Sequence, residues 1–304
     1  MSDAPTVDWV EVGPRDGLQS WSTTLPTPTK VGLVTSLLDC GFRRVEATSM
    51  VHPKWVPQLA DAEAVLEALQ DRIDRLRVLV PNRRGLDRAR QAGVRNIAVT
   101  VAATDGYNQH NLNRSVKQTL EEIAEIASEA RRDGLVVDAS ISVAFGCPYE
   151  GSVAPERVGE VAAALADDGI EEISLGDTTG VANPALVEAL FQALKERLPA
   201  VRWGAHFHDS RGTAMANLLA ALETGVNLFE GSVGGIGGSP FAPGAAGNIC
   251  SEDALAMLEA MGIGTGIDVK RLTEVARGLE RTLGSPLPGK VHAIQQSEAG
   301  GVPA

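Results

Sequence analysis

The sequence predicts an α/β protein that forms a single (β/α)8 TIM barrel with additional C-terminal helices. Short β-branched or apolar runs alternate with helical patterns along the whole chain, as expected for repeated βα units around a parallel sheet. Eight such runs can be counted. No linker or low-complexity insert interrupts them, so all 304 residues are assigned to one domain. We expect the barrel over about residues 8–262, and a C-terminal helix and tail over about residues 263–304.

The expected strands are short runs that end at turn-forming or polar residues. They cover Trp9–Gly13, Val45–Ser49, Leu76–Val80, Asn96–Ala102, Val136–Val143, Glu172–Leu175, Trp203–His208 and Leu228–Val233. A doubly wound sheet is the alternative fold. A strand count near eight, without a signal for reversed strand order, favours the barrel.

The clearest expected helix is Ser115–Arg132, where apolar residues recur at helical spacing and Gly134 supplies a C-terminal stop. The same pattern predicts helices over Ala154–Asp168, Pro184–Leu198, Thr213–Glu223, Ser251–Met261 and Val269–Leu283. A tail rich in Gly, Pro and Ser begins at Gly284 and is expected to be mobile at least beyond Gln295.

Charge and composition exclude several classes of function. A formal net charge of −12 argues against nucleic-acid binding, because phosphates need a basic surface. The chain starts without a signal-peptide pattern and has no apolar run of about 18 residues, so we expect a cytoplasmic protein without a membrane span. Cys40, Cys147 and Cys250 are too scattered for a disulfide framework and are expected to be reduced thiols.

Ionisable residues gather at the ends of the expected strands, where the reactive groups of a (β/α)8 barrel lie. Such residues are costly at buried strand ends unless they are paired or used. They are Glu11, Arg15 and Asp16 at the first strand, Glu46 at the second, Asp177 at the sixth, and His206 and His208 at the seventh.

His206 and His208 are candidate metal ligands. Two residues apart in a strand, their imidazoles project from the same face and can reach one ion, and Asp16 can add a carboxylate. This set suits Mg²⁺ or Mn²⁺ and, less diagnostically, Co²⁺ or Zn²⁺. Alternatively, one histidine is a hydrogen-bonded core residue and the other caps the strand. Only five histidines occur in the chain, and two lie where the barrel places its active site.

Arg15 directly precedes Asp16 in a Gly-Pro-Arg-Asp-Gly turn and offers a cation beside the expected metal. The alternative is an arginine paired only for structure, and Glu46 and Asp177 have the same alternative as ion-pair partners. The glycine-rich segment 234–238 after the eighth strand allows the backbone to approach a ligand closely.

Six motifs together resemble the 3-hydroxy-3-methylglutaryl-CoA lyase family. They are VEVGPRDGLQ (10–19), PKWVPQ (53–58), GCPYEG (146–151), ISLGDT (173–178), HFHD (206–209) and GGSPFAPGAAGN (237–248). The resemblance extends from about Asp8 to about Lys290, in family order and without large insertions. It implies a TIM-barrel, divalent-metal-dependent retro-Claisen lyase that cleaves a short 3-hydroxyacyl-CoA into acetyl-CoA and a keto acid.

The resemblance also implies roles for individual residues. Asp16, His206, His208 and Asn248 match the metal ligands, and Arg15 matches the cation that stabilises the enolate oxygen. Glu46, Asp177 and His206 belong to the proton-handling groups. Gln19, Gly237, Gly238 and Glu252 match positions around the substrate. The expected cofactor is Mg²⁺ or Mn²⁺, with CoA as part of the substrate, and the expected assembly is a homodimer or higher homo-oligomer.

Several positions around the mouth depart from the family pattern. The glycine-rich loop has Ser239 where the family has a catalytic cysteine, and a hydroxyl is a much weaker acid than a thiol, whose pKa is about 8.5. His52 replaces a serine, Arg211 replaces a tyrosine, and Gly284-Ser285-Pro286 replaces an Asn-Arg-Lys stretch. We therefore hypothesise that the acyl group differs from 3-hydroxy-3-methylglutaryl, and that His52 or Arg211 contacts the different substituent.

Two other functions remain open at this point. A Claisen-type synthase would run the same chemistry forward, although the chain lacks the C-terminal regulatory domain that such synthases often carry. A catalytically impaired paralogue would bind an acyl-CoA or a metal without turnover, because Ser239 has replaced the proton donor. Cys250 could in principle replace the missing thiol, but it also fits a small buried residue.

Overall fold

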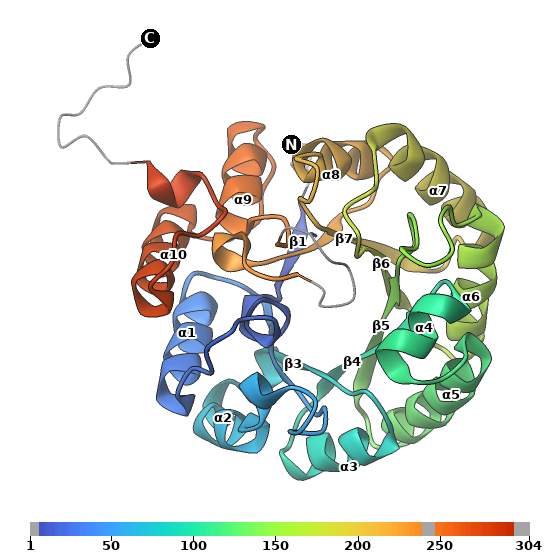
Figure 1. Cartoon of the computed structure of the whole chain (residues 1–304), viewed down its shortest axis with the longest axis horizontal. Helices are drawn as coiled ribbons and strands as arrows, with labels where there is room; N and C mark the ends of the chain where they lie inside the picture. Colours follow the sequence, from blue (N-terminus) through green and yellow to red (C-terminus); the bar gives the residue numbers. More distant parts are fainter. Residues whose placement is uncertain (1–5, 239–246, 295–304) are drawn as a thin grey trace, which may run out of the picture.

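Eight parallel strands close into a barrel in which each strand pairs with its neighbours in chain order, which confirms the predicted fold (Figure 1). The computed structural model describes residues 6–238 and 247–294. The strands are β1 (Asp8–Glu11), β2 (Arg44–Ser49), β3 (Leu76–Leu79), β4 (Asn96–Ala102), β5 (Val136–Ser142), β6 (Glu172–Asp177), β7 (Arg202–Phe207) and β8 (Leu228–Gly231). Pairing of β1 with β8, from Asp8 opposite Leu228 to Glu11 opposite Gly231, closes the barrel.

The strand ends differ from the predicted ones where the chain turns into the active-site loops. β1 ends at Glu11, because Gly13–Gly17 forms a π-helical turn that hydrophobicity alone does not reveal. β5 ends at Ser142, since Val143 adopts a left-handed φ of 52°. β6 continues to Asp177, so this carboxylate belongs to the strand itself.

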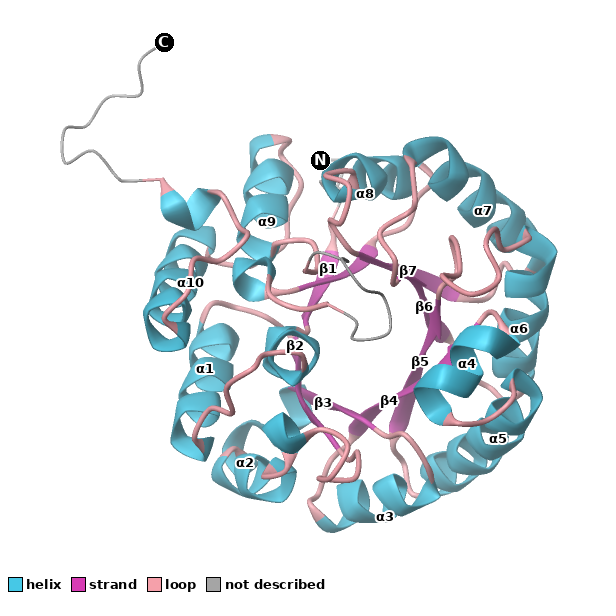
Figure 2. Ribbon diagram, viewed as in Figure 1, coloured by secondary structure: helices cyan, strands magenta, loops and turns pink. Residues whose placement is uncertain are grey.

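Helices form a ring around the barrel, as Figure 2 shows. They are α1 (Thr27–Asp39), α2 (Ala62–Ala68), α3 (Arg83–Gln91), α4 (Asp105–Leu112), α5 (Val116–Arg132), α6 (Pro155–Asp167), α7 (Pro184–Arg197), α8 (Ala214–Glu223), α9 (Ser251–Ala260) and α10 (Val269–Leu283). In α5, Ser115 and Gln118 form a capping box, and Gly134 follows the C-terminus with a φ of 73°. Within the described ranges, no helix is long and apolar enough to cross a bilayer.

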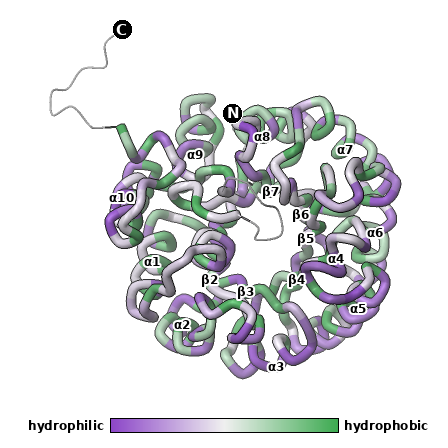
Figure 3. The backbone as a smooth tube through the Cα atoms, in the orientation of Figure 1, coloured by the Kyte–Doolittle hydropathy of each residue, from purple (hydrophilic) through white to green (hydrophobic). Residues whose placement is uncertain are grey.

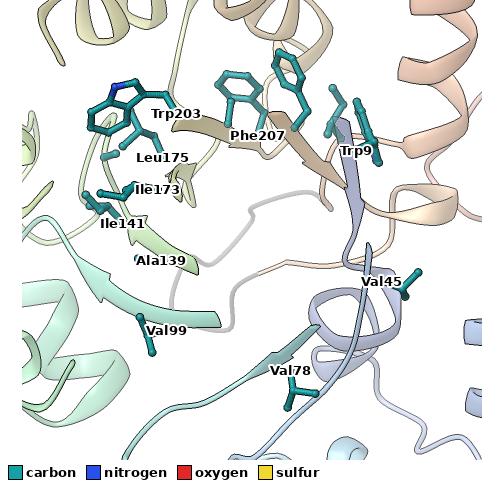
Figure 4. Packing of buried hydrophobic residues seen from close by; sticks show 14 of the residues in the cluster. Trp9, Val45, Val78, Val99, Ala139, Ile141, Ile173, Leu175, Trp203 and Phe207 are labelled. Atoms are coloured by element: carbon teal, nitrogen blue, oxygen red, sulfur yellow. The ribbon is translucent and has the colours of Figure 1, made fainter. Parts of the chain in front are cut away.

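The apolar core lies between the strands and the surrounding helices. Buried side chains such as Val99, Ile141 and Phe207 occupy the outer side of the strands in Figure 4. Figure 3 shows hydrophobic and hydrophilic residues alternating along the outer helices, as amphipathic helices require. Because alternate strand residues point to opposite faces, the remaining strand side chains point into the barrel.

Charged residues occupy much of the barrel interior. Near the amino-terminal ends of the strands, Arg44 lies 3.2 Å from Asp8, 3.0 Å from Asp138 and within ion-pair distance of Glu172. Arg202 pairs with Asp8 and Glu172 from the other side. These pairs engage the charged side chains at this end of the barrel, whereas the predicted functional residues lie at the opposite end.

The C-terminal segment packs beneath the loop that follows β8. α10 contacts α1 and α9 (Figure 1), and the segment 284–294, predicted as part of the tail, includes the buried residues Leu287 and His292. The imidazole of His292 lies between Glu252 and Glu280, at 3.0 and 3.1 Å. Glu252 also accepts the backbone N–H of Gly234 at 2.9 Å, so this cluster ties the C-terminal segment to the active-site end of β8.

We predict that replacing His292 with Asn destabilises the protein in a pH-dependent way. The hydrogen bond to Glu252 raises the pKa of His292 above its usual value. Its contribution is therefore complete below about pH 6.5 and is lost as the pH rises through the higher folded-state value. The free energy of unfolding in urea should fall by about 2 kcal/mol at pH 6 and by less at pH 9.

The matched control is His110→Asn, which changes an exposed histidine on α4. Its effect should stay within about 0.5 kcal/mol at both pH values. A loss in His292→Asn that is as large at pH 9 as at pH 6 would contradict the charged pairing.

Candidate active site

The π-helical turn after β1 carries Arg15 and Asp16 and is held against the loop after β8. A Cβ atom on Gly17 would lie only 2.5 Å from the side chain of Ile236, so glycine permits this close approach. Glu11 accepts the N–H groups of Gly13 and Val233, at 2.9 and 2.8 Å. Burial raises the pKa of Glu11 to about 8, but these donors oppose the rise. Glu11 therefore joins the first and last strands of the barrel.

Asp16, His206 and His208 converge on one point at the carboxyl ends of β1 and β7. One ligand atom from each lies within 4.8 Å of the others, among the residues that the structure describes. The Nε2 atoms of the two histidines are 3.2 Å apart, and Nε2 of His206 lies 3.9 Å from Oδ2 of Asp16. The two imidazoles therefore lie on the same face beside Asp16, as their spacing predicted, and metal binding by this group stays a prediction.

Asn248 completes this set of oxygen and nitrogen donors. Its Nδ2 group donates to Oδ2 of Asp16 at 2.7 Å, and its backbone bridges to that of His208. Its Oδ1 atom is buried without a hydrogen-bond partner in the described parts of the chain. A buried polar atom without a partner is costly, and a carbonyl oxygen is a ligand for hard cations. The residues present therefore fit a divalent ion.

Electrostatics keep Asp16 and His208 in the forms that bind a metal. Burial raises the pKa of Asp16, but Arg15 and His206 more than offset that rise, so the carboxyl has a lowered pKa. Burial lowers the pKa of His208 to about 4, so the ring is neutral near pH 7. A carboxylate and a neutral imidazole are the forms that ligate metals.

Glu230 on β8 orients His206, and the sequence analysis did not identify it. Its Oε2 atom lies 3.0 Å from Nδ1 of His206, which leaves Nε2 directed at Asp16 and His208. Burial would lower the pKa of His206, but the hydrogen bond to Glu230 raises it above the usual value. A charged residue inside the apolar run of β8 was the available signal, since such a residue needs a buried partner.

Arg15 is paired and still available for a ligand. Its Nε donates to Oε1 of Glu46, and its Nη1 lies 2.7 Å from Oδ1 of Asp16, which also accepts from Gln19. Its Nη2 group has no hydrogen-bond partner among the residues with a described position. Arg15 therefore fits both interpretations: it is a cation beside the predicted metal ligands, and it is also paired within the structure.

Asp177 lies at the end of β6 with its carboxylate turned toward the following loop. Oδ1 accepts the N–H of Val181 at 2.9 Å, and both oxygens lie 3.2 Å from the N–H of Ala182. Burial raises the pKa of Asp177 to about 6, although these donors and the charge of His206 act in the opposite direction. The alternative role of Asp177 as an ion-pair partner finds no partner in the described part of the chain, where its carboxylate accepts backbone N–H groups. A carboxyl with this pKa is suited to proton transfer.

Three of the other predicted substrate-contacting residues lie outside this cluster, and Gly237 lies against it. His52 and Arg211 are exposed, in the loops that follow β2 and β7. Glu252 is fully buried against Gly234 and His292, so it supports the loop after β8 and has no surface for a substrate. Gly237, with a φ of 134°, packs against the Asn248 side chain, where a Cβ atom would lie 2.4 Å from Nδ2.

The structure describes one of the two candidate proton donors, Cys250, but not the other, Ser239. Ser239 lies outside the described residues, and the loop from Gly238, whose φ is 140°, leads into it. Cys250 is buried before α9, and burial raises the pKa of its thiol well above the usual value. Cys250 therefore fits the small buried residue of the alternative interpretation.

A comparison with family models matches residues 6–278 to the HMGL-like family. The chain belongs to this family. Hydroxymethylglutaryl-CoA lyase of Bacillus subtilis is 42% identical over 281 residues, 92% of this chain and 94% of the relative. (R)-Citramalyl-CoA lyase of Chloroflexus aurantiacus is also 42% identical, over 293 residues, 93% of this chain and 92% of the relative.

The HMGL-like fold is also similar to that of solved structures. An HMG-CoA lyase from Acinetobacter baumannii, solved in complex with coenzyme A and 3-methylmalate, has a TM-score of 0.92 and 34% identity, with full coverage of both chains. The resemblance seen in the six motifs is thus confirmed. The two relatives at equal identity carry different acyl groups in their names, so family membership leaves the acyl group open.

We predict that the double variant His206→Ala/His208→Ala loses more than about 100-fold in Mn²⁺ affinity, because even outer-shell partners typically contribute ~10–100-fold. Titration of the purified protein followed by the electron paramagnetic resonance signal of free Mn²⁺ measures this directly. His110→Ala, which removes an exposed histidine elsewhere, should leave the affinity unchanged. Unchanged affinity in the double variant would remove the proposed metal centre.

Proposed function

We propose that this chain is a divalent-metal-dependent lyase that cleaves a short 3-hydroxyacyl-CoA by a retro-Claisen reaction into acetyl-CoA and a keto acid. The observation that carries the proposal is the convergence of Asp16, His206 and His208 beside the Arg15 guanidinium. Relatives at 42% identity are named lyases of acyl-CoA esters, and a similar structure contains coenzyme A.

Asp16, His206, His208 and Asn248 would hold the ion, and their mixed nitrogen and oxygen donors suit Mg²⁺ or Mn²⁺. When bound, such an ion supplies Lewis acidity that lowers the pKa of a substrate hydroxyl. The contact of Glu230 with Nδ1 of His206 leaves Nε2 as the atom that would bind the ion. We also propose a homodimer or higher homo-oligomer that acts in the cytoplasm.

Asp177 is the base that removes the proton from the C3 hydroxyl of the substrate. Nδ1 of His206 is engaged by Glu230, and its Nε2 points at the ligand cluster, which leaves Asp177 as the better acceptor. The Val181 and Ala182 donors fix the orientation of its carboxylate. Transfer of the proton to Asp177 forms the C3 carbonyl as the carbon–carbon bond breaks, and the electron pair passes to the enolate of acetyl-CoA.

Arg15 stabilises the enolate that bond cleavage creates. Two of its nitrogens are fixed by Glu46 and Asp16, so the guanidinium is oriented before the substrate binds. A cation held in place needs no reorganisation as negative charge develops, and such preorganised groups typically contribute about 10²–10³ in rate. Ser239 of the glycine-rich loop then gives its hydroxyl proton to the enolate carbon, and acetyl-CoA is released. Ser239 regains a proton from solvent and Asp177 loses its own to solvent, so the cycle has no net proton change.

The residues around the mouth are the basis of our proposal for the acyl group. We propose an ester related to 3-hydroxy-3-methylglutaryl-CoA with a different substituent, because the exposed His52 and Arg211 can meet a group beyond C3. Citramalyl-CoA is one such ester, in which the carboxylate is bonded directly to C3. Its cleavage would give pyruvate, whereas the methylglutaryl ester would give acetoacetate.

We predict that the purified protein with Mg²⁺ or Mn²⁺ releases acetyl-CoA from at least one of three ester types: 3-hydroxy-3-methylglutaryl-CoA, citramalyl-CoA and longer 3-alkyl analogues. Coupled detection of acetyl-CoA, with the keto acid identified by mass spectrometry, measures kcat/KM for each ester. Cleavage of the methylglutaryl ester alone, at full efficiency, would contradict a changed acyl group.

The variant Ser239→Cys separates an active lyase from an impaired paralogue. An active wild type should cleave an ester, and the variant should change the rate without changing the order of preference among esters. If the wild type turns over no ester and Ser239→Cys gains activity, the binding paralogue is the correct interpretation. Formation of a branched hydroxyacyl ester from acetyl-CoA and a keto acid would instead favour the synthase.

The assignment of Asp177 predicts the pH dependence of cleavage. The base is the carboxylate, and its pKa is raised to about 6, so kcat/KM should rise about tenfold per pH unit below pH 6 and level off above it. Asp177→Asn should lower kcat by about 10²–10⁴. Rates between pH 5 and 8, with urea unfolding as a control for folding, test this. A flat profile through pH 6 would exclude Asp177 as the base.

A further inference from the structure

Arg77 on β3 places a buried cation inside the barrel, between the two groups of side chains that carry the proposed chemistry. It is only 3% exposed. Its Nε atom lies 2.7 Å from Oε2 of Glu46 on the adjacent strand, and its Nη1 atom lies 2.8 Å from Oε1 of Glu230 on β8. The contact with Glu46 is an ion pair without the alignment of a hydrogen bond. The guanidinium therefore spans from β3 to a strand that is not its neighbour in the barrel.

In each of these two carboxylates, one oxygen contacts Arg77 and the other contacts a residue of the candidate site. Glu46 gives Oε2 to Arg77 and Oε1 to Arg15, and Glu230 gives Oε1 to Arg77 and Oε2 to His206. Arg15 and His206 meet again through Asp16, whose two oxygens lie 2.7 and 3.9 Å from them. The side chains of these residues thus form a closed ring in which Arg77 lies opposite Asp16.

We propose that Arg77 is a positioning residue that sets the relative placement of Arg15 and His206 through Glu46 and Glu230. The inference rests on the proposed metal site and extends it to a residue that contacts neither metal nor substrate. Glu46 and Glu230 are 0% and 4% exposed, and without Arg77 each would keep only one charged neighbour of the ring. Buried carboxylates that lose a counter-ion move or are neutralised, and outer-shell carboxylates orient ligating histidines.

The alternative is an arginine that only fills the barrel. Arg77 also lies 3.8 Å from Asp138, which pairs with Arg44 in the network near the amino-terminal ends of the strands. Arg44 is therefore a matched control, because it is a barrel arginine that shares Asp138 but has no ion pair with Glu46 or Glu230 among the described residues. A purely structural role would make the two arginines equivalent in their effect on metal binding.

The experiment compares Arg77→Met, Arg77→Lys and Arg44→Met with the wild type in full-length protein. Mn²⁺ affinity from the resonance signal of free Mn²⁺ is the primary measurement, and urea unfolding at the same pH is the second. We expect Arg77→Met to weaken Mn²⁺ binding about 10-fold or more, in the range of outer-shell changes. Arg77→Lys should recover only part of this, since an ammonium cannot address two carboxylates with the fork geometry of a guanidinium.

Arg44→Met should keep Mn²⁺ affinity within about twofold, whatever it does to unfolding, because its partners lie outside the ring. Unchanged affinity in Arg77→Met, or equal weakening in Arg44→Met, would overturn the inference while leaving the metal site intact. If Arg77→Met does not fold, the lysine variant decides, and affinity equal to wild type would overturn the proposal. A wild type that binds no Mn²⁺ would overturn the metal site and the inference together.

Discussion

Buried charge in the barrel must be paired, and this constraint determines the arrangement of the functional end of the molecule. Charged and ionisable side chains enter the interior from β1, β2, β3, β7 and β8, where an isolated ion would be costly. The structure satisfies the requirement by letting each carboxylate serve two partners. As a result, the position of Arg15 depends on Glu46, the orientation of His206 depends on Glu230, and both depend on Arg77.

The surrounding fold supplies the apolar contacts that the polar interior lacks. Most apolar contacts lie between strands and helices, and Val10, Val12 and Leu228 form a small separate cluster at β1 and β8. The stability of the barrel therefore does not depend mainly on a hydrocarbon interior. Close backbone contacts then bring the first and last strands together: Gly17 permits the approach to Ile236, and Glu11 fastens Gly13 to Val233. Gly234 is held in turn by Glu252, which accepts its N–H group and also pairs with His292. Asp16 and Asn248 consequently meet, although they belong to opposite ends of the barrel sequence.

The sequence predicted what depends on periodicity and local spacing. Eight strands, the capped helix after Ser115, and the common face of His206 and His208 follow from repeats of two and 3.6 residues. It did not predict Glu230 or Arg77 as functional neighbours, because their partners are on distant strands and the orientation of each side chain depends on barrel closure. The π-helical turn at Asp16 was missed for a similar reason, since it is stabilised by the loop after β8.

This distribution of contacts explains how residues proposed to contact the acyl group can change while the residues of the ring stay the same. A substitution within the ring leaves a buried partner without its counter-charge, so one change there affects several groups at once. His52 and Arg211 lie in exposed loops. Within the two described segments of the chain, neither pairs with a carboxylate of the ring, because Glu46 and Glu230 pair with Arg77. Changes at these two positions therefore disturb few contacts. The departures from the family pattern at His52 and Arg211 therefore fall where a change disturbs few contacts, whereas a change at Asp16, His206 or their supporting carboxylates would leave a buried charge without its partner.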